Sequence, residues 1–417
     1  MAPAVAREAK SGGRAFGVYV HVPFCSVRCG YCDFNTYAPG ELDGASREGY
    51  VEAALGELAL ARRIMGADPR PASTIFFGGG TPTMLDPAAL ARLLEGVRET
   101  WGLAPGAEVT TEANPDSVDG AALAALAEAG FTRVSLGMQS AAPHVLRTLD
   151  RTHRPENVVR AIAGAKAAGL ATSLDLIYGT PGESLDDWRA SVDAAIALAP
   201  DHLSAYALVI EPGTKMGAQL RRGEVPPVDP DVQAEMYEAA DDAFAAAGYA
   251  WYEVSNWART PADACRHNVG YWRGQDWWGI GPGAHSYLEG PGGAARRWWN
   301  VKHPRAYAER VRAGASPEEG GEDLTGEQRY VERVMLGVRL AEGLPVSELR
   351  PAGRARLDGL GRDGLIDTAR ARLDGLGRDG PGREGPARDG AEHDGAVVLT
   401  RRGRLLADAV IRELAWD

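Results

Sequence analysis

Three of the four cysteines in this 417-residue chain lie close together in the stretch "FCSVRCGYCDF". Cys25, Cys29 and Cys32 place three thiols on one loop that is short enough to surround a single metal centre. A closed zinc site takes four ligands, and a [4Fe-4S] cluster that only carries electrons takes four thiolates. Three thiolates would leave one iron of such a cluster open to a substrate or a cofactor.

Spacing alone leaves two plainer interpretations of these thiols open. His21 or Cys265 could complete a zinc site, or the cysteines could simply pack against their neighbours. A disulfide framework is not expected, because three cysteines are bunched, the fourth is distant, and thiols inside cells are kept reduced. We therefore interpret the stretch as a metal-binding or reactive loop.

The composition is that of an ordinary globular protein, with 45% hydrophobic and 24% charged residues. No run of apolar residues is long enough for a secretory signal or a membrane-spanning helix. We therefore expect a cytoplasmic protein without a transmembrane segment. The net charge of −12 does not suggest a basic surface, so no nucleic-acid partner is expected.

Short β-rich runs alternate with amphipathic helical stretches from residue 16 to about 215. This alternation is typical of βα units with a parallel sheet, and six such units predict an α/β fold with a partial (β/α)6 TIM-like barrel. The runs are "FGVYVHV", "STIFFGGG", "EVTTEAN", "RVSLGMQ", "TSLDLIYG" and "HLSAYALVI". A polar or glycine-rich cluster follows each run, and chemistry in such barrels sits at the carboxyl ends of the strands. We expect one shared site at that mouth of the sheet.

Four segments are expected along the chain. They are a flexible tail (1–15), the barrel (16–215), a connecting α/β extension rich in tryptophan (216–320) and a small helical, winged-helix-like domain (321–417).

The last segment contains a direct repeat. The stretch "RARLDGLGRDG" occurs at residues 354–364 and again at 370–380, and a glycine-rich stretch with few apolar residues follows it. Such a composition cannot bury enough surface to order itself. We interpret residues 354–395 as a flexible, duplicated loop.

The order of motifs along the barrel resembles that of the radical S-adenosylmethionine (radical SAM) superfamily. "CSVRCGYC" is followed by "GGGTP", "TEANPDS", "RVSLGMQS" and "LDLIYGTPGES". Together with "CRHNVGYWRGQDWWGIGPGAHSY", these stretches resemble the group that contains the oxygen-independent coproporphyrinogen III dehydrogenases and the HemW heme chaperones. The resemblance covers about residues 16 to 290. It implies a [4Fe-4S] cluster, S-adenosyl-L-methionine as its cofactor, and an electron donor that reduces the cluster.

The resemblance places the three cysteines as cluster ligands and eight further residues around the cofactor: Tyr19, Gly79, Gly80, Thr81, Glu112, Gln139, Arg151 and Asp175. The two glycines and the threonine would offer backbone to the methionyl part, where a Cβ would block a close approach. Glu112 and Gln139 would bind polar groups of the cofactor, Arg151 its carboxylate, and Asp175 its ribose hydroxyls. The plainer alternatives are a glycine turn, solvated strand ends and a surface arginine.

Phe34 bears on the choice between two functions within this group. The dehydrogenase motif continues with a further cysteine two residues after the third, whereas this chain reads "CDFN", as the HemW-type members do. The resemblance therefore favours a heme chaperone that binds heme and delivers it to acceptor proteins such as respiratory enzymes. The alternative is a coproporphyrinogen III dehydrogenase that forms protoporphyrinogen IX through a 5′-deoxyadenosyl radical. A second copy of the chain is a further candidate partner, in a homodimer.

A heme needs an apolar slot, an axial ligand for its iron and cations for its propionates. The stretch "RHNVGYW" offers His267 beside Tyr271 and Trp272, and it resembles the His-Asn-x-x-Tyr-Trp motif of the HemW group. We name His267 as the candidate heme ligand, and the alternative is a hydrogen-bonded core histidine. His21 and His285 are weaker candidates for the same role.

Overall fold

The computed structural model describes residues 14–42, 44–66, 70–371 and 395–416. The chain divides into two compact units. The first comprises residues 1–250, 255–271 and 275–324, and the second comprises residues 251–254, 272–274 and 325–417. The tail expected at residues 1–15 lies almost wholly outside the described residues. The boundaries expected at residues 215 and 320 stay predictions.

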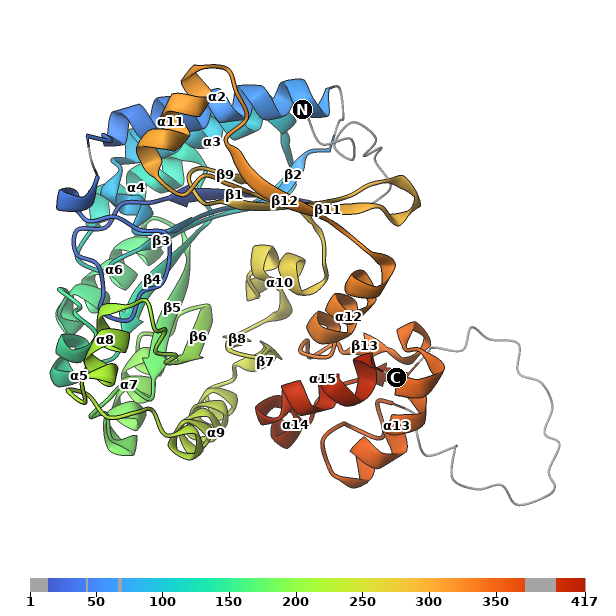
Figure 1. Ribbon diagram of the computed structural model, residues 1–417. Coiled ribbons are helices and arrows are strands. Elements are labelled where there is room, and N and C mark those ends of the chain that lie inside the picture. The colour runs from blue at the N-terminus through green and yellow to red at the C-terminus, as the bar shows by residue number, and fades with distance from the viewer. Residues whose placement is uncertain (1–13, 43, 67–69, 372–394, 417) are drawn as a thin grey trace, which may run out of the picture. The chain divides into compact units, whose positions relative to one another are not determined.

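In the described part of the first unit, six consecutive strands run parallel, and each pairs with the next along the chain (Figure 1). They are β1 (Phe16–Val22), β2 (Ala72–Gly79), β3 (Leu103–Ala113), β4 (Arg133–Gln139), β5 (Ala171–Tyr178) and β6 (His202–Ala207). Apolar side chains such as Val18, Ile75 and Leu174 are fully buried, as expected of a parallel sheet that is covered on both faces. The α/β fold predicted from the sequence is confirmed.

Helices connect the strands and lie along the outer side of the curved sheet (Figure 1). They are α2 (Arg47–Met65), α3 (Pro87–Trp101), α4 (Gly120–Ala129), α5 (Pro143–Thr148), α6 (Pro155–Ala167) and α7 (Leu185–Ala197). In α3 the Asp86 carboxylate caps the first turn by accepting from the backbone N–H of Ala89, and Leu90, Leu93 and Val97 bury one face. The helices cover the outer side of the sheet. The loops that follow the carboxyl ends of the strands are therefore available to form a site.

Further strands widen the sheet at both edges. β9 pairs parallel with β1 and is followed by the antiparallel neighbours β10, β11 and β12, whereas β8 pairs antiparallel with β6. Their bounds are β8 (Asn256–Ala258), β9 (Asp276–Ile280), β10 (His285–Glu289), β11 (Ala295–Asn300) and β12 (Glu318–Leu324). The remaining helices of this region are α8 (Lys215–Arg221), α9 (Pro230–Ala246), α10 (Arg266–Trp272) and α11 (Pro304–Arg312), with 3-10 turns η1 (Pro39–Glu41), η2 (Pro82–Met84), η3 (Pro261–Asp263) and η4 (Pro291–Gly293).

The second unit is mostly helical and has its own apolar core. Its elements are α12 (Gly326–Gly337), β13 (Leu344–Pro345), η5 (Val346–Glu348), α13 (Pro351–Arg362), β14 (Ala396–Val397), α14 (Arg401–Leu405) and α15 (Ala407–Ala415), and β7 spans Ala250–Glu253. β13 and β14 pair antiparallel, and Val334, Leu344, Val410 and Leu414 lie in the core. The sequence predicts a small helical, winged-helix-like domain here, and the pairing of β13 with β14 was not part of that prediction.

One part of the repeat departs from the sequence-based expectation. The first copy, at residues 354–364, lies mostly on α13 and is helical, so its interpretation as a flexible loop is wrong. The physical reason is that Leu357 and Leu360 lie on one face of the helix and are buried in the core of the second unit. Most of the second copy, and the stretch after it, lie outside the described residues.

Across the described residues, every helix is either too short or too polar to span a bilayer.

Candidate cofactor site

A cavity of about 510 Å³ opens among the loops that follow the strands of the first unit. The twelve residues expected at the cluster, the cofactor and the heme all line this cavity: Tyr19, Cys25, Cys29, Cys32, Gly79, Gly80, Thr81, Glu112, Gln139, Arg151, Asp175 and His267. The weaker heme-ligand candidates His21 and His285 do not line it. They come from β1 to β5, from the loops after these strands, and from α10. The parallel order of the strands brings these positions together from across 249 residues of chain (Tyr19 to His267).

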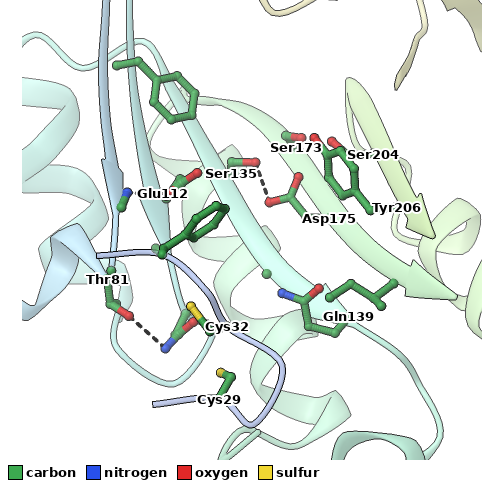
Figure 2. A pocket seen from close by; sticks show the side chains of 18 of the residues that line it. Cys29, Cys32, Thr81, Glu112, Ser135, Gln139, Ser173, Asp175, Ser204 and Tyr206 are labelled. Atoms are coloured by element: carbon green, nitrogen blue, oxygen red, sulfur yellow. Dashed lines mark hydrogen bonds between the residues drawn. The ribbon is translucent and has the colours of Figure 1, made fainter. Parts of the chain in front are cut away.

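The three cysteines lie half-buried on the loop that follows β1. Backbone hydrogen bonds close the base of this loop, from the N–H of Cys25 to the carbonyl of Tyr37 (3.1 Å) and from the N–H of Tyr37 to the carbonyl of Pro23 (2.8 Å). Figure 2 shows Cys29 and Cys32 on the same loop at the edge of the pocket. Burial raises the pKa of the Cys25 thiol to about 11. We call residues 25–37 the cysteine loop.

The zinc alternative is not formed in this conformation. In the described part of the chain, no three His, Cys, Asp or Glu side chains converge on one ion position. Both ring nitrogens of His21 have partners, and the Cys265 thiol donates to the carboxylate of Glu108 (3.7 Å). In a four-iron cluster each thiolate binds a different iron, so three cysteines around a cavity suit a cluster without meeting at one point.

Arg151 lies beside the cysteine loop, where it is partly buried. Its Nη1 donates to the sulfur of Cys29 (3.5 Å), and its Nη2 donates to Oδ1 of Asn114 (2.6 Å) and to the carbonyl of Gly137 (3.0 Å). A guanidinium in this place offers hydrogen bonds and positive charge to an anionic group in the cavity. Sequence reasoning missed Asn114, although its place in "EANPD", two residues after Glu112, was a usable signal.

Two carboxyl groups face the middle of the cavity. Glu112 accepts a hydrogen bond from the backbone N–H of Gly79 (3.1 Å), and Asp175 accepts one from the hydroxyl of Ser135 (2.8 Å; Figure 2). Burial, and to a lesser extent the charge of Asp175, raises the pKa of Glu112 to about 8. Burial also raises the pKa of Asp175, against the hydrogen bonds from Ser135 and Ser204. Two acids of this kind suit a ligand that carries positive charge and hydroxyl groups.

Gln139 is held in an unusual backbone conformation. Its φ is +60°, which is the left-handed region, and the pairing of β4 with β5 shifts between Leu136 and Gln139. A bulge of this kind turns a side chain toward a new direction, and strained residues cluster at functional sites. Here the side chain of Gln139 lines the cavity.

The two glycines at the end of β2 are also required by the packing of the chain, and their expected contact with the cofactor stays a prediction. A Cβ on Gly79 would come within 2.5 Å of the His21 ring, and a Cβ on Gly80 would come within 2.6 Å of the carbonyl of Phe24. Both positions therefore need glycine to let the chain pack around β1, whatever binds in the cavity. Their backbone still lines the cavity, together with the buried Thr81.

His267 is buried, and both of its ring nitrogens have partners. The Thr74 hydroxyl lies 2.9 Å from Nδ1, and the Tyr271 hydroxyl lies 2.9 Å from Nε2. Burial lowers the pKa of His267 to about 3, so the ring is neutral, and it stacks on Phe76. A ring nitrogen must be free to bind iron. These contacts favour the hydrogen-bonded histidine, and the heme-ligand role stays a prediction.

Exposed apolar side chains surround the mouth of the cavity. Val27 and Phe34 come from the cysteine loop, and Tyr206 and Val209 come from β6 and the segment after it. Phe34 is 62% exposed and Val209 is 65% exposed, which is unusual for large apolar residues. We call these four residues the apolar rim. Sequence reasoning singled out only Phe34, although the apolar run "ALVI" at the end of β6 was a signal for Val209.

Comparison with known proteins places this geometry in a family. The model of the radical SAM superfamily matches residues 19–195. The chain is 49% identical to the protein named heme chaperone HemW from Mycobacterium tuberculosis (strain H37Rv), over 96% of this chain and 95% of that one. The chain belongs to the HemW family. A HemW heme chaperone from Escherichia coli (strain K12) is 38% identical over 79% of this HemW-family chain and 83% of its own length.

A solved structure shows the same fold. Coproporphyrinogen III oxidase (HemN) from Escherichia coli, described as a radical SAM enzyme, superimposes with a TM-score of 0.75 over 98% of this chain and 91% of that one. The two sequences are 22% identical, so the likeness supports the shared architecture alone. Together with the matched family model, it confirms the radical SAM fold of this chain.

Proposed function

We propose that this protein is a heme chaperone that holds a [4Fe-4S] cluster with S-adenosyl-L-methionine, binds heme, and delivers it to acceptor proteins such as respiratory enzymes. The observation that carries the proposal is the 49% identity to a HemW heme chaperone along almost the whole of both chains. The gathering of all twelve expected residues around one cavity supports it.

Cys25, Cys29 and Cys32 would hold the cluster, and Arg151 would donate to the sulfur of Cys29. When bound and reduced, the cluster supplies an electron for the cleavage of S-adenosyl-L-methionine. Glu112 and Asp175 would accept from the polar and positively charged parts of the cofactor, and Gln139 offers both a donor and an acceptor. The chain itself orients the cofactor and keeps water out.

Heme is proposed to bind at the apolar rim. A macrocycle with flat apolar faces gains most where large apolar side chains are otherwise exposed to water. Phe34 and Tyr206 offer aromatic rings, and Val209 an aliphatic side chain, at the opening of the cavity. This proposal does not need His267 to give up its hydrogen bonds to Thr74 and Tyr271.

One anaerobic experiment tests the function. The cluster is reconstituted, and the protein is titrated with heme while the Soret band is followed. In parallel it receives coproporphyrinogen III, reductant and S-adenosyl-L-methionine. We expect stable heme binding without decarboxylation. Turnover of coproporphyrinogen III without stable heme binding would support the dehydrogenase instead.

Substitutions locate the heme. We expect Phe34→Ala and Val209→Ser each to weaken heme binding by about tenfold, because a lost apolar contact costs about 1–2 kcal/mol. Val159→Ser on α6 is the matched control, since Val159 is exposed but lies away from the rim. His267→Ala tests the alternative ligand, and a loss of the heme spectrum in this variant alone would move the site to α10.

A further inference from the structure

Asn35, three residues after Cys32, uses both of its side-chain N–H donors and its side-chain oxygen in hydrogen bonds. Its side-chain Nδ2 donates to the carbonyls of Pro282 (3.0 Å) and Lys302 (2.8 Å). Its Oδ1 accepts from the hydroxyl of Tyr37 (3.2 Å). A primary amide has two N–H donors, and here each meets one carbonyl oxygen. A carboxylate at this position would set an oxygen against both carbonyls.

The backbone carbonyl of Asn35 is also held. It faces Nε2 of the buried His21 (2.9 Å), while Nδ1 of that ring faces the hydroxyl of Tyr19 (3.0 Å). Since a carbonyl only accepts, Nε2 carries the proton and Nδ1 accepts from Tyr19. Burial lowers the pKa of His21 to about 4, so this neutral tautomer persists at neutral pH. A continuous set of hydrogen bonds thus joins a residue of the cavity wall to the cysteine loop.

The loop between β9 and β10 comes close to Asn35 and to the strand before it because it contains glycine. Gly283 has φ +74°, and a Cβ there would come within 2.7 Å of Nδ2 of Asn35. Gly281 has φ +106°, and a Cβ there would come within 2.5 Å of the carbonyl of His21. The loop between β9 and β10 is therefore shaped to receive Asn35.

The receiving loop is itself anchored. The N–H of Gly281 donates to the buried carboxylate of Glu57 on α2 (2.8 Å), and Nδ2 of Asn300 donates to the same carboxylate (2.7 Å). The N–H of Gly283 donates to the carbonyl of Val301 (3.0 Å). The strands that widen the sheet beyond β1 thus provide a fixed base for the cysteine loop.

We propose that Asn35 is a positioning residue, which ties the cysteine loop to the loop between β9 and β10 and to the segment after β11, and so fixes the three thiolates in the arrangement that retains the cluster. The inference rests on the proposed function, because it takes the cluster as given. Replacing a residue that orients metal ligands without binding the metal itself typically lowers metal affinity by about 10–100-fold.

The test compares four variants of the full chain after anaerobic reconstitution: Asn35→Asp, Asn35→Ala, Gly283→Ala and the control Gly314→Ala. Gly314 has φ +71°, which is close to that of Gly283, but a Cβ there meets nothing within 4 Å, so the control carries the backbone strain without the contact. The readouts are iron and sulfide per chain, the rate of iron loss to a chelator, the electron paramagnetic resonance spectrum of the reduced cluster, and the melting temperature.

We expect Asn35→Asp and Gly283→Ala to lose iron about tenfold faster than wild type and to alter the spectrum, with Gly314→Ala unchanged. Asn35→Ala, which adds no charge, decides the matter if Asn35→Asp does not fold. Variants that melt earlier but keep the spectrum and the rate of iron loss would overturn the positioning role. A wild-type protein that takes up no four-iron cluster would instead overturn the proposed function itself.

Discussion

Glu112 is a carboxyl group that burial keeps protonated at neutral pH, with its pKa raised to about 8. A cationic ligand favours the ionised carboxylate, so binding must be accompanied by release of that proton below pH 8. The affinity for S-adenosyl-L-methionine should therefore rise by up to about tenfold per pH unit up to about pH 8 and level off above it.

The measurement is calorimetric titration of wild type and Glu112→Gln with S-adenosyl-L-methionine between pH 6.5 and 8.5. The difference between the two proteins isolates this carboxyl from groups on the cofactor. We expect the variant to lack the rise with pH. Parallel pH profiles in the two proteins would contradict the assignment of Glu112 to the positive part of the cofactor.

At this scale the sequence predicted which residues meet, and it did not predict what each one contacts. The twelve positions were read from motifs whose order follows the strands. The partners of His267 could not be read in this way, because Thr74 lies 193 residues earlier in the chain and meets it only across the fold. The protein neighbours of the glycines at the end of β2 could not be read from the sequence either, since His21 and Phe24 belong to another strand and the loop after it.

At the scale of elements, α2, α11 and the end of β11 meet at one buried acid. Glu57 on α2 accepts from the hydroxyl of Tyr307 (2.5 Å) and from Nδ2 of Asn300 (2.7 Å). Burial outweighs these bonds and raises the pKa of Glu57 to about 7 from its ordinary 4.5. The folded state then binds a proton that the unfolded state releases. The associated stability is present below about pH 4.5 and is lost as the pH rises through about 7.

We predict that the free energy of unfolding of wild type, relative to Glu57→Gln, falls by about 3 kcal/mol between pH 4.5 and 8, since one pKa unit corresponds to about 1.4 kcal/mol. Urea unfolding at several pH values measures it. Glu48→Gln, on an exposed position of the same helix, is the control for replacing a glutamate that is not buried. A constant difference between wild type and Glu57→Gln would show that the carboxyl titrates normally.

The strands of the barrel were predictable because each is a short apolar run with a polar or glycine-rich end. β1 and β4 match the predicted runs at both ends, whereas β6 ends at Ala207 and leaves Val209 outside the strand. The place of β9 beside β1 was not predictable. It depends on a pairing between residues about 260 apart, which no local pattern encodes. The helical first copy of the repeat was not predicted because glycine lowers helix propensity. Leu357 and Leu360 are nevertheless buried on one face of that helix.

At the scale of the whole molecule, the cavity and the second core belong to different units. Every residue that lines the cavity lies in the first unit, and Leu357 lies in the apolar core of the second. We expect Leu357→Ala to destabilise the second unit by about 2–4 kcal/mol, as truncation of a buried leucine does. Cluster content and affinity for S-adenosyl-L-methionine should stay at wild-type levels.

Differential scanning calorimetry and iron analysis of the full-length variant check this prediction. Leu405→Ala, at an exposed position of α14, is the control for a leucine truncation that leaves no cavity. A loss of iron from Leu357→Ala at a temperature where the second unit is still folded would contradict the prediction. It would mean that cluster retention in the first unit depends on the packing of the second core.

The apolar rim has a kinetic consequence, because it surrounds the opening through which Glu112, Gln139 and Asp175 are reached. A small polar cofactor and a flat apolar ligand would then have to enter in a fixed order, the cofactor first. Heme bound at the rim would block this opening, so S-adenosyl-L-methionine should exchange more slowly once heme is present. Exchange of a radiolabelled cofactor, followed with and without heme, would show whether the two ligands leave in reverse order of arrival.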